Sequence, residues 1–369
     1  MTDTPTTRIL DAAVNRTNEG LRVVEDFVRF VLDDAHLTAI LKQLRHDLRE
    51  ACSALPSALR HAARDTQHDV GTQISTAEET RRAGAWDVCQ ASCERVKQSL
   101  RSLEEYSKVA APALAARLES LRYRFYTIEG TLTLSQDGRL RLRGVNLCVL
   151  IDGFNSTEEF AHLAQQLVAA DVPMIQLRDK RLSDAELVER ARVLVKIARS
   201  ADLPSPSPSP PRQTSGLTGR GTTLAIVNDR ADVAATVDAD GVHLGQDDLS
   251  VKDARSIVGP RKLIGVSTHN IEQARIAVLD GANYLGAGPT FPSSTKEFKG
   301  FPGLKFLQQL ADEIGLPSFA IGGIEPENLP QVLAAGFERV AVSGAVTQAE
   351  KPVDAVRAIL NILRHGTAC

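Results

Sequence analysis

The chain has 369 residues, which is too long for one ordinary domain and suits about two. Hydrophobic residues make up 43% of it and aromatic residues only 4%, which favours helical and α/β architecture over an aromatic-rich β-sandwich. The 43 Lys and Arg residues nearly balance 46 Asp and Glu residues, and the net charge of -3 gives no broad electrostatic reason to bind nucleic acid or an anionic membrane.

Apolar runs and cysteines predict a soluble, cytoplasmic protein. No run approaches the roughly 20 apolar residues that cross a bilayer, and residues 1–7 are polar, unlike a signal peptide. The five cysteines lack CxxC spacing. Cys89 and Cys93 are expected to be small buried side chains on a helix rather than metal ligands, and reduced thiols fit the cytoplasm.

Residues 1–130 are predicted to form an all-helical domain. Four segments have helical periodicity, with little strand pattern and few glycines between them. The expected helices are Ile9–Leu32, Leu37–Ala54, Ala85–Val109 and Ala113–Thr127. In the first helix, Val31 is expected on the apolar face. Glu25 is expected on the opposite, solvated face, where it would pair with Arg29.

Residues 131–144 are predicted to be a hairpin or linker. Leu132–Arg143 alternates apolar and polar residues around Asp137-Gly138, a dipeptide that favours a tight β-turn. This segment would cap the helical domain or join it to the next one.

Residues 145–369 alternate strand and helix patterns. The eight apolar runs are Asn146–Asp152, Met174–Lys180, Thr223–Asp229, Gly241–Gly245, Leu263–Thr268, Asn283–Pro289, Ser318–Ile324 and Arg339–Val346. Eight strand–helix repeats predict a closed (β/α)8 TIM barrel, and an open doubly wound sheet is the alternative. The expected fold class is therefore α/β, with an all-α domain preceding the barrel. Residues 204–221 are rich in Pro and Ser and are expected to be a disordered insertion.

Polar side chains follow the predicted strands where a barrel places its active site. Gln176, Arg178 and Lys180 lie two residues apart and so share one face, and two cations there suit a diphosphate. Asp229 and Asp248 follow neighbouring strands. Because two unpaired carboxylates would repel each other, a Mg²⁺ ion between them is expected.

The remaining strands carry further polar groups. His243 lies within a strand without a second histidine nearby, so it is expected to be a hydrogen-bonding core residue rather than a metal ligand. Ser267 ends the fifth strand. Hydroxyls, a lysine and exposed backbone NH groups in the Gly-rich loops after the last three strands can wrap a phosphate. These positions are Ser293, Thr295, Lys296, Gly323, Ser343 and Gly344.

The barrel motifs together resemble the thiamine-phosphate synthase family, from Asn146 to about Arg364. The runs that carry the resemblance are Gln176-Leu177-Arg178-Asp179-Lys180, Asn228-Asp229, Gly241 to Asp248, Gly265-Val266-Ser267, Gly288 to Lys296 and Ile321-Gly322-Gly323-Ile324. The resemblance implies that hydroxymethylpyrimidine diphosphate and thiazole phosphate are joined to give thiamine phosphate and diphosphate. It also implies a dissociative reaction, in which diphosphate leaves before the thiazole nitrogen attacks.

The resemblance further implies roles for individual residues. Gln176 would face the pyrimidine. The catalytic residues, which would hold the diphosphate, are Arg178, Lys180, Asn228, Ser267 and Lys296, with Mg²⁺ on Asp229 and Asp248. Thiazole phosphate would contact Ser293, Thr295, Gly323, Ser343 and Gly344. Ser293 stands where family members often carry Thr, and Gly344 where some carry Ser, so these departures bear on affinity for thiazole phosphate.

Two alternatives for the barrel are a thiazole tautomerase and a non-catalytic thiazole-phosphate-binding protein. The presence of Arg178, Lys180, Asp229, Asp248 and Lys296 argues against both. The expected partners are the small-molecule substrates, and neither nucleic acid nor a membrane is expected to bind. A homo-oligomer is possible from the sequence.

The helical domain has a resemblance of its own. The runs Asn15-Arg16, Glu19-Gly20-Leu21-Arg22, Glu25-Asp26, Arg64-Asp65 and Asp69-Val70-Gly71 are similar to a module fused to some of these synthases. That module is proposed to be a hydroxymethylpyrimidine-phosphate kinase. Because the sequence has no Walker A loop, a structural or oligomerisation role is the alternative.

Overall fold

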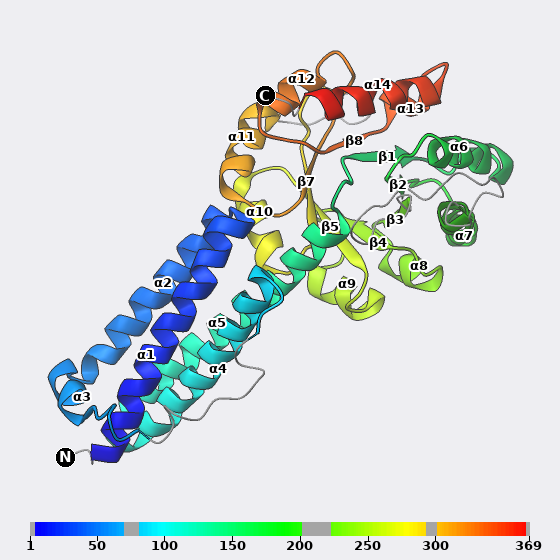
Figure 1. Ribbon diagram of the computed structural model, residues 1–369. Coiled ribbons are helices and arrows are strands. Elements are labelled where there is room, and N and C mark those ends of the chain that lie inside the picture. Colours follow the sequence, from blue (N-terminus) through cyan, green and yellow to red (C-terminus); the bar gives the residue numbers. More distant parts are fainter. Residues whose placement is uncertain (1–3, 70–80, 201–222, 293–300, 367–369) are drawn as a thin grey trace. The chain divides into compact units, whose positions relative to one another are not determined.

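The computed structural model describes residues 4–69, 81–200, 223–292 and 301–366, and the chain divides into two compact units (Figure 1). Met1–Thr133 and Glu313–Gly315 form the helical unit, and Leu134–Asp312 and Leu316–Cys369 form the barrel unit. The Pro/Ser-rich segment 204–221 lies outside the described residues, as do Val70 and Gly71.

Helices build the helical unit, and the long ones among them lie side by side (Figure 1). They are α1 (Thr4–Phe27), α2 (Ala35–Ala51), α3 (Ser57–Ala63), α4 (Ala85–Ala110) and the first part of α5 (Pro112–Arg141). A Cβ atom on Gly20 of α1 would lie 2.6 Å from the Val96 side chain of α4, so glycine lets these two helices approach closely. The four helical segments predicted from periodicity are confirmed.

The first predicted helix differs from expectation in its faces. α1 ends at Phe27 and continues as a wider π-helical turn over Val28–Leu32, which rotates Val31 outward to 43% exposure. Glu25 is fully buried rather than solvated. Arg45 Nε of α2 donates to its carboxylate at 2.7 Å, and Arg22 lies 3.4 Å from it. The expected pairing of Glu25 with Arg29 was therefore wrong, because α2 packs on this face of α1 and supplies a different arginine.

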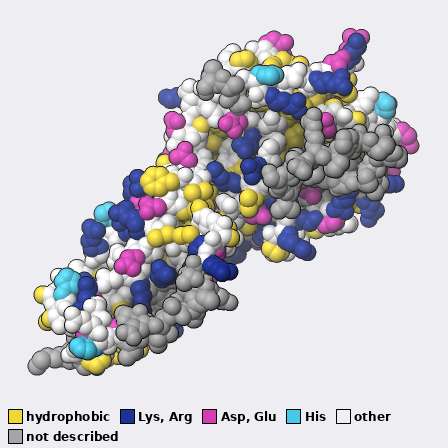
Figure 2. Space-filling view, viewed as in Figure 1, with side chains coloured by type: hydrophobic (Ala, Val, Ile, Leu, Met, Phe, Trp, Pro, Cys, Tyr) yellow, Lys and Arg dark blue, Asp and Glu magenta, His cyan; other side chains and the backbone are white. Residues whose placement is uncertain are grey.

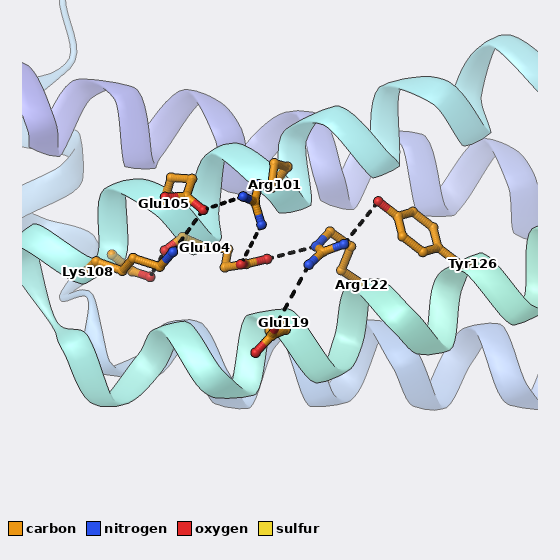
Figure 3. A network of polar contacts seen from close by, with 8 residues as sticks. Arg101, Glu104, Glu105, Lys108, Glu119, Arg122 and Tyr126 are labelled. Carbon is orange, nitrogen blue, oxygen red and sulfur yellow. Dashed lines mark hydrogen bonds and ion pairs between the residues drawn. The ribbon is translucent and has the colours of Figure 1, made fainter.

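A network of charged side chains joins α4 and α5 (Figure 3). Arg122 Nε donates to Glu104 at 2.7 Å, and both side chains are more than nine-tenths buried. Arg101 contacts the same carboxylate at 2.8 Å, and Arg122 also donates to the Tyr126 hydroxyl at 3.1 Å. At the exposed end of the network, Lys108 pairs with Glu105. Over the face shown in Figure 2, Lys and Arg side chains are likewise interspersed with acidic ones.

The hairpin predicted over residues 131–144 was wrong, because α5 runs as one helix through Arg141. Buried residues recur every three or four positions, which is a helical period, at Ile128, Leu132, Ser135, Gly138 and Leu142. Gly138 serves close packing rather than a turn. A Cβ atom there would lie 2.2 Å from the Asn283 carbonyl oxygen, so only glycine fits against that backbone.

Eight parallel strands form a closed barrel in sequence order, which confirms the barrel and excludes the open sheet. They are β1 (Leu147–Ile151), β2 (Met174–Leu177), β3 (Leu224–Asn228), β4 (Gly241–Leu244), β5 (Leu263–Thr268), β6 (Tyr284–Ala287), β7 (Ser318–Ile321) and β8 (Val340–Val342). The helices around them are α6 (Thr157–Ala169), α7 (Asp184–Ser200), α8 (Ala231–Thr236), α9 (Val251–Val258), α10 (Ile271–Leu279), α11 (Gly303–Glu313), α12 (Leu329–Ala334), α13 (Gly344–Thr347) and α14 (Pro352–His365).

Apolar side chains fill the amino-terminal part of the barrel interior. The cluster comprises Leu142, Val145, Cys148, Leu150, Met174, Ile226, Leu263, Tyr284, Phe319 and Ala341. Polar side chains therefore remain for the carboxyl ends of the strands, where barrels place their sites. Cys89 and Cys93 are buried free thiols, as predicted. Within the described ranges, none of the helices has the length and apolar character needed to span a bilayer.

Candidate active site

A small cavity of about 50 Å³ lies inside the barrel, and each of the eight strands contributes to its wall. The lining residues are Cys148, Leu150, Gln176, Arg178, Asn228, His243, Ser267, Tyr284, Gly286, Phe319, Ile321 and Ala341. Four of them, Gln176, Arg178, Asn228 and Ser267, are residues that the sequence predicted to bind substrate. The structure thus brings together side chains from β2, β3 and β5.

Gln176 and Asn228 hold each other at the cavity wall. Gln176 Nε2 donates to Asn228 Oδ1 at 2.7 Å, between neighbouring strands β2 and β3. This bond leaves the Gln176 oxygen and the Asn228 nitrogen available to a ligand, so the pair presents an acceptor oxygen and a donor NH2 group. Arg178 follows β2, and its backbone NH donates to the Ile151 carbonyl at 2.8 Å, which extends the ladder with β1 beyond the strand.

The carboxylates of Asp229 and Asp248 meet at the ends of β3 and β4, close enough for a side-chain hydrogen bond. Asp229 has a left-handed backbone (φ 61°), which aspartate tolerates, and its NH donates to the His243 carbonyl at 2.7 Å. The Gly245 NH donates to Asp248 Oδ2 at 2.7 Å. Lys180 Nζ lies 3.4 Å from Asp229 Oδ2. Each carboxylate is therefore held in place by backbone geometry.

The electrostatics of this pair suit a cation. Burial and the neighbouring Asp248 raise the pKa of Asp229, and Lys180 only partly offsets them. Two hard carboxylate oxygens side by side are ligands that Mg²⁺ accepts, with waters and phosphate oxygens completing its shell. Among the described residues, no group of three or more His, Cys, Asp and Glu side chains forms a metal site made of protein alone.

His243 is the hydrogen-bonding core residue that the sequence predicted. Its Nε2 lies 2.9 Å from Ser267 Oγ and its Nδ1 lies 3.3 Å from the Tyr284 hydroxyl. Burial, and then the charge of Arg178, lower the pKa of His243 to about 4. The imidazole is therefore neutral at physiological pH.

The residues predicted to bind thiazole phosphate that the structure describes lie outside the cavity lining. Gly323 has a left-handed backbone (φ 60°), and a Cβ atom there would lie 2.5 Å from the Pro292 carbonyl oxygen. Ser343 Oγ donates to the Leu150 carbonyl at 3.1 Å, and Gly344 begins α13. None of these three lines the cavity. Ser293, Thr295 and Lys296 lie outside the described residues.

Sequence reasoning missed two features of the site. Tyr284 lines the cavity at the start of β6, and the available signal was its position two residues before Gly286 on the same face of the strand. Asp179 anchors the loop after β2. It accepts from the Gly153 NH at 3.0 Å and the Arg181 NH at 2.7 Å, and the hydrogen bond from the Arg181 side chain is the largest cause lowering its pKa to about 2.

Two family models match the chain, and curated relatives are similar to it. The family model described as thiamine monophosphate synthase matches residues 212–346, and that of the ThiD2 family matches residues 8–131. Thiamine-phosphate synthase of Rhodopirellula baltica is 42% identical over 348 residues, covering 92% of this chain and 88% of that protein. The synthase of Gloeobacter violaceus is 39% identical and covers 97% of each.

A solved structure is similar to the barrel. Thiamine phosphate pyrophosphorylase from Pyrococcus furiosus matches with a TM-score of 0.50 and 30% sequence identity. The match covers 62% of this chain and 100% of the Pyrococcus chain. The relatives from Rhodopirellula and Gloeobacter extend over both units of the chain. The chain therefore belongs to the thiamine-phosphate synthase family.

Proposed function

We propose that the barrel joins hydroxymethylpyrimidine diphosphate to thiazole phosphate, giving thiamine phosphate and diphosphate. The observation that carries this proposal is the convergence of Gln176, Arg178, Asn228 and Ser267 on one cavity, with Lys180 beside the Asp229–Asp248 pair. A thiazole tautomerase or a thiazole-phosphate-binding protein would not require the cations and paired carboxylates together.

The proposed roles follow from the charge that develops in the reaction. Diphosphate gains negative charge as its bond to the pyrimidine methylene breaks, and Arg178 and Lys180 would stabilise that charge. Asn228 and Ser267 would donate hydrogen bonds to its oxygens, and Gln176 would orient the pyrimidine through its free amide oxygen. Lys296 is proposed to hold the diphosphate as well. Ser293, Thr295, Gly323, Ser343 and Gly344 are proposed to bind thiazole phosphate.

Mg²⁺ is the proposed cofactor, and Asp229 and Asp248 are the residues that would hold it. The raised pKa of Asp229 beside Asp248 supports this, because a cation relieves the repulsion of two close carboxylates. When bound, the ion would supply Lewis-acid stabilisation of diphosphate oxygens. Lys180 pairs with the Asp229 carboxylate at 3.4 Å.

The test is a reconstituted reaction of the full chain with both substrates, in the presence of MgCl₂ or of EDTA. We expect thiamine phosphate and diphosphate to appear in equal amounts with Mg²⁺ and not with EDTA. A folded protein that binds thiazole phosphate but releases no diphosphate would contradict the proposal. Asp232→Asn is the matched control for substitutions of Asp229. Asp232 is exposed, and within the described residues its carboxylate pairs with the Arg230 side chain alone.

We further propose that the helical unit phosphorylates hydroxymethylpyrimidine phosphate. The ThiD2 match over residues 8–131 supports this, as does a cluster of arginines. Arg64 and Arg60 both contact the buried Asp11, at 2.7 and 3.3 Å, and Arg8 donates to the Asp65 carbonyl at 2.9 Å. Arginines in such number suit a phosphorylated substrate.

The full chain carrying Asp229→Asn tests this second activity, because it should not consume the diphosphate. We expect hydroxymethylpyrimidine diphosphate to accumulate when this variant receives ATP and the monophosphate. Absence of that product, with normal helical content, would leave the structural or oligomerisation role. A cytoplasmic location, and the absence of nucleic-acid and membrane partners, stay predictions from composition.

A further inference from the structure

Three residues in one row of the barrel place His243 against Tyr284. His243 on β4 is opposite Gly265 on β5, and Gly265 is opposite Tyr284 on β6. A Cβ atom on Gly265 would lie 2.1 Å from the Tyr284 ring and 2.5 Å from His243 Nδ1. Because Gly265 has no side chain, the rings of His243 and Tyr284 meet across β5, although β4 and β6 are not neighbouring strands. Their centroids are 5.5 Å apart.

The next row places His243 against Ser267. Ser267 on β5 is opposite Gly286 on β6, and a Cβ atom on Gly286 would lie 3.1 Å from the His243 ring. The imidazole thus turns its Nε2 to Ser267 Oγ at 2.9 Å while its Nδ1 faces the Tyr284 hydroxyl at 3.3 Å. These contacts form a continuous chain, Tyr284–His243–Ser267, along the wall of the cavity.

The positions of the protons in this chain follow from hydrogen-bond capacity. Tyr284 is 3% exposed, and His243 Nδ1 is the one nitrogen or oxygen recorded within hydrogen-bond distance of its hydroxyl in the described parts of the chain. When the Tyr284 hydroxyl donates to His243, Nδ1 offers its lone pair. The single proton of a neutral imidazole then resides on Nε2 and is donated to Ser267 Oγ.

We propose that Tyr284 is a positioning residue that fixes the Nε2–H tautomer of His243, so that the Ser267 hydroxyl directs its own proton into the cavity toward a diphosphate oxygen. The inference rests on the proposed role of Ser267. In the opposite tautomer Ser267 would donate to Nε2, and its proton would be withdrawn from the substrate. Tyr284 therefore acts on the leaving group through His243 and Ser267, by way of three successive hydrogen bonds.

The test is Tyr284→Phe in the full chain, which removes the hydroxyl and keeps the ring that packs on Phe319. We expect kcat to fall about tenfold, the effect of one lost hydrogen bond to a charged group, with an unchanged KM for thiazole phosphate. The double variant Tyr284→Phe with Ser267→Ala should be no slower than Ser267→Ala alone. Tyr126→Phe, which removes a hydroxyl in the helical unit, should retain the normal rate.

Nitrogen-15 NMR of histidine-labelled protein gives a readout that needs no turnover. His243, assigned by loss of its signal in His243→Gln, should be the Nε2–H tautomer in the unsubstituted chain and a mixture in Tyr284→Phe. An unchanged tautomer in Tyr284→Phe, or losses that multiply in the double variant, would overturn the inference. An unsubstituted chain that forms no thiamine phosphate would instead sink the proposed function, since the tautomer is measured independently of it.

Discussion

The side chains of Asp229 and Asp248 lie within hydrogen-bond reach of each other at the ends of two adjacent strands, and each is positioned by a different backbone feature. Asp229 projects from a left-handed turn after β3, and Asp248 folds back to accept the Gly245 NH. A proton or a cation would relieve the repulsion between two carboxylates held this close.

Asp229→Asn should lower the rate of thiamine phosphate formation by at least about a hundredfold, because it removes one of the two carboxylates proposed to hold a cation against the departing diphosphate. Asparagine is chosen because it tolerates the left-handed backbone that alanine would strain. Steady-state rates with saturating MgCl₂ check this, and thiazole phosphate binding by calorimetry should be unchanged. Activity above a tenth of the normal rate would be incompatible with the proposed metal site.

Asp179→Asn should destabilise the barrel most at neutral pH. The pKa of Asp179 is about 2 in the folded chain, chiefly through the Arg181 side chain, and about 3.9 in an unfolded one. A depressed pKa contributes stability that is fully present above the unfolded value and is lost as the pH falls toward the folded one. The difference in urea midpoint between the two proteins should therefore shrink between about pH 4 and pH 2. Asp312→Asn, an exposed position on α11, is the control, and a difference that stays constant with pH would contradict the assignment.

Much of the barrel could be predicted because each strand is a short apolar run that ends in polar residues. That pattern alone places Asp229, Asp248, Arg178 and Ser267 at one end of the sheet. The Tyr284–His243 contact could not be predicted in this way. It depends on the register of three strands and on the side chain that Gly265 lacks, and neither is a property of a single segment.

The helical unit was harder to predict for a related reason. Periodicity places Glu25 among polar residues, but its burial depends on α2 bringing Arg45 to it. Likewise Leu132–Arg143 fits a two-residue period as well as a helical one. Its helical state becomes clear only from the packing of Gly138 on the Asn283 backbone. Local pattern therefore predicts the elements, and tertiary contacts decide the ambiguous faces.

Arg122→Met should destabilise the helical unit by about 3 kcal/mol, because the buried Glu104 carboxylate loses its main partner while the methylene packing is kept. Lys108→Met is the matched control, since its pair with Glu105 is exposed and should contribute at most about 1 kcal/mol (Figure 3). The single tryptophan, Trp86, packs on Phe27 in this unit, so its fluorescence in urea reports the change selectively. Equal effects of the two substitutions would show that burial of the Glu104–Arg122 pair carries no special energy.

Gly130→Ala and Gly138→Ala, both within α5, should change stability in opposite directions. A Cβ atom on Gly130 has nothing within 4 Å, so alanine should stabilise the helix by about 0.5–1 kcal/mol. At Gly138 the same atom would lie 2.2 Å from the Asn283 carbonyl oxygen, and Asn283 also bonds Leu134 and Ile264. The backbone must shift, so we expect a loss of about 2 kcal/mol despite the gain in helix propensity. Urea unfolding followed by circular dichroism measures both, and a similar gain at the two positions would refute the close packing of α5 on the Asn283 backbone.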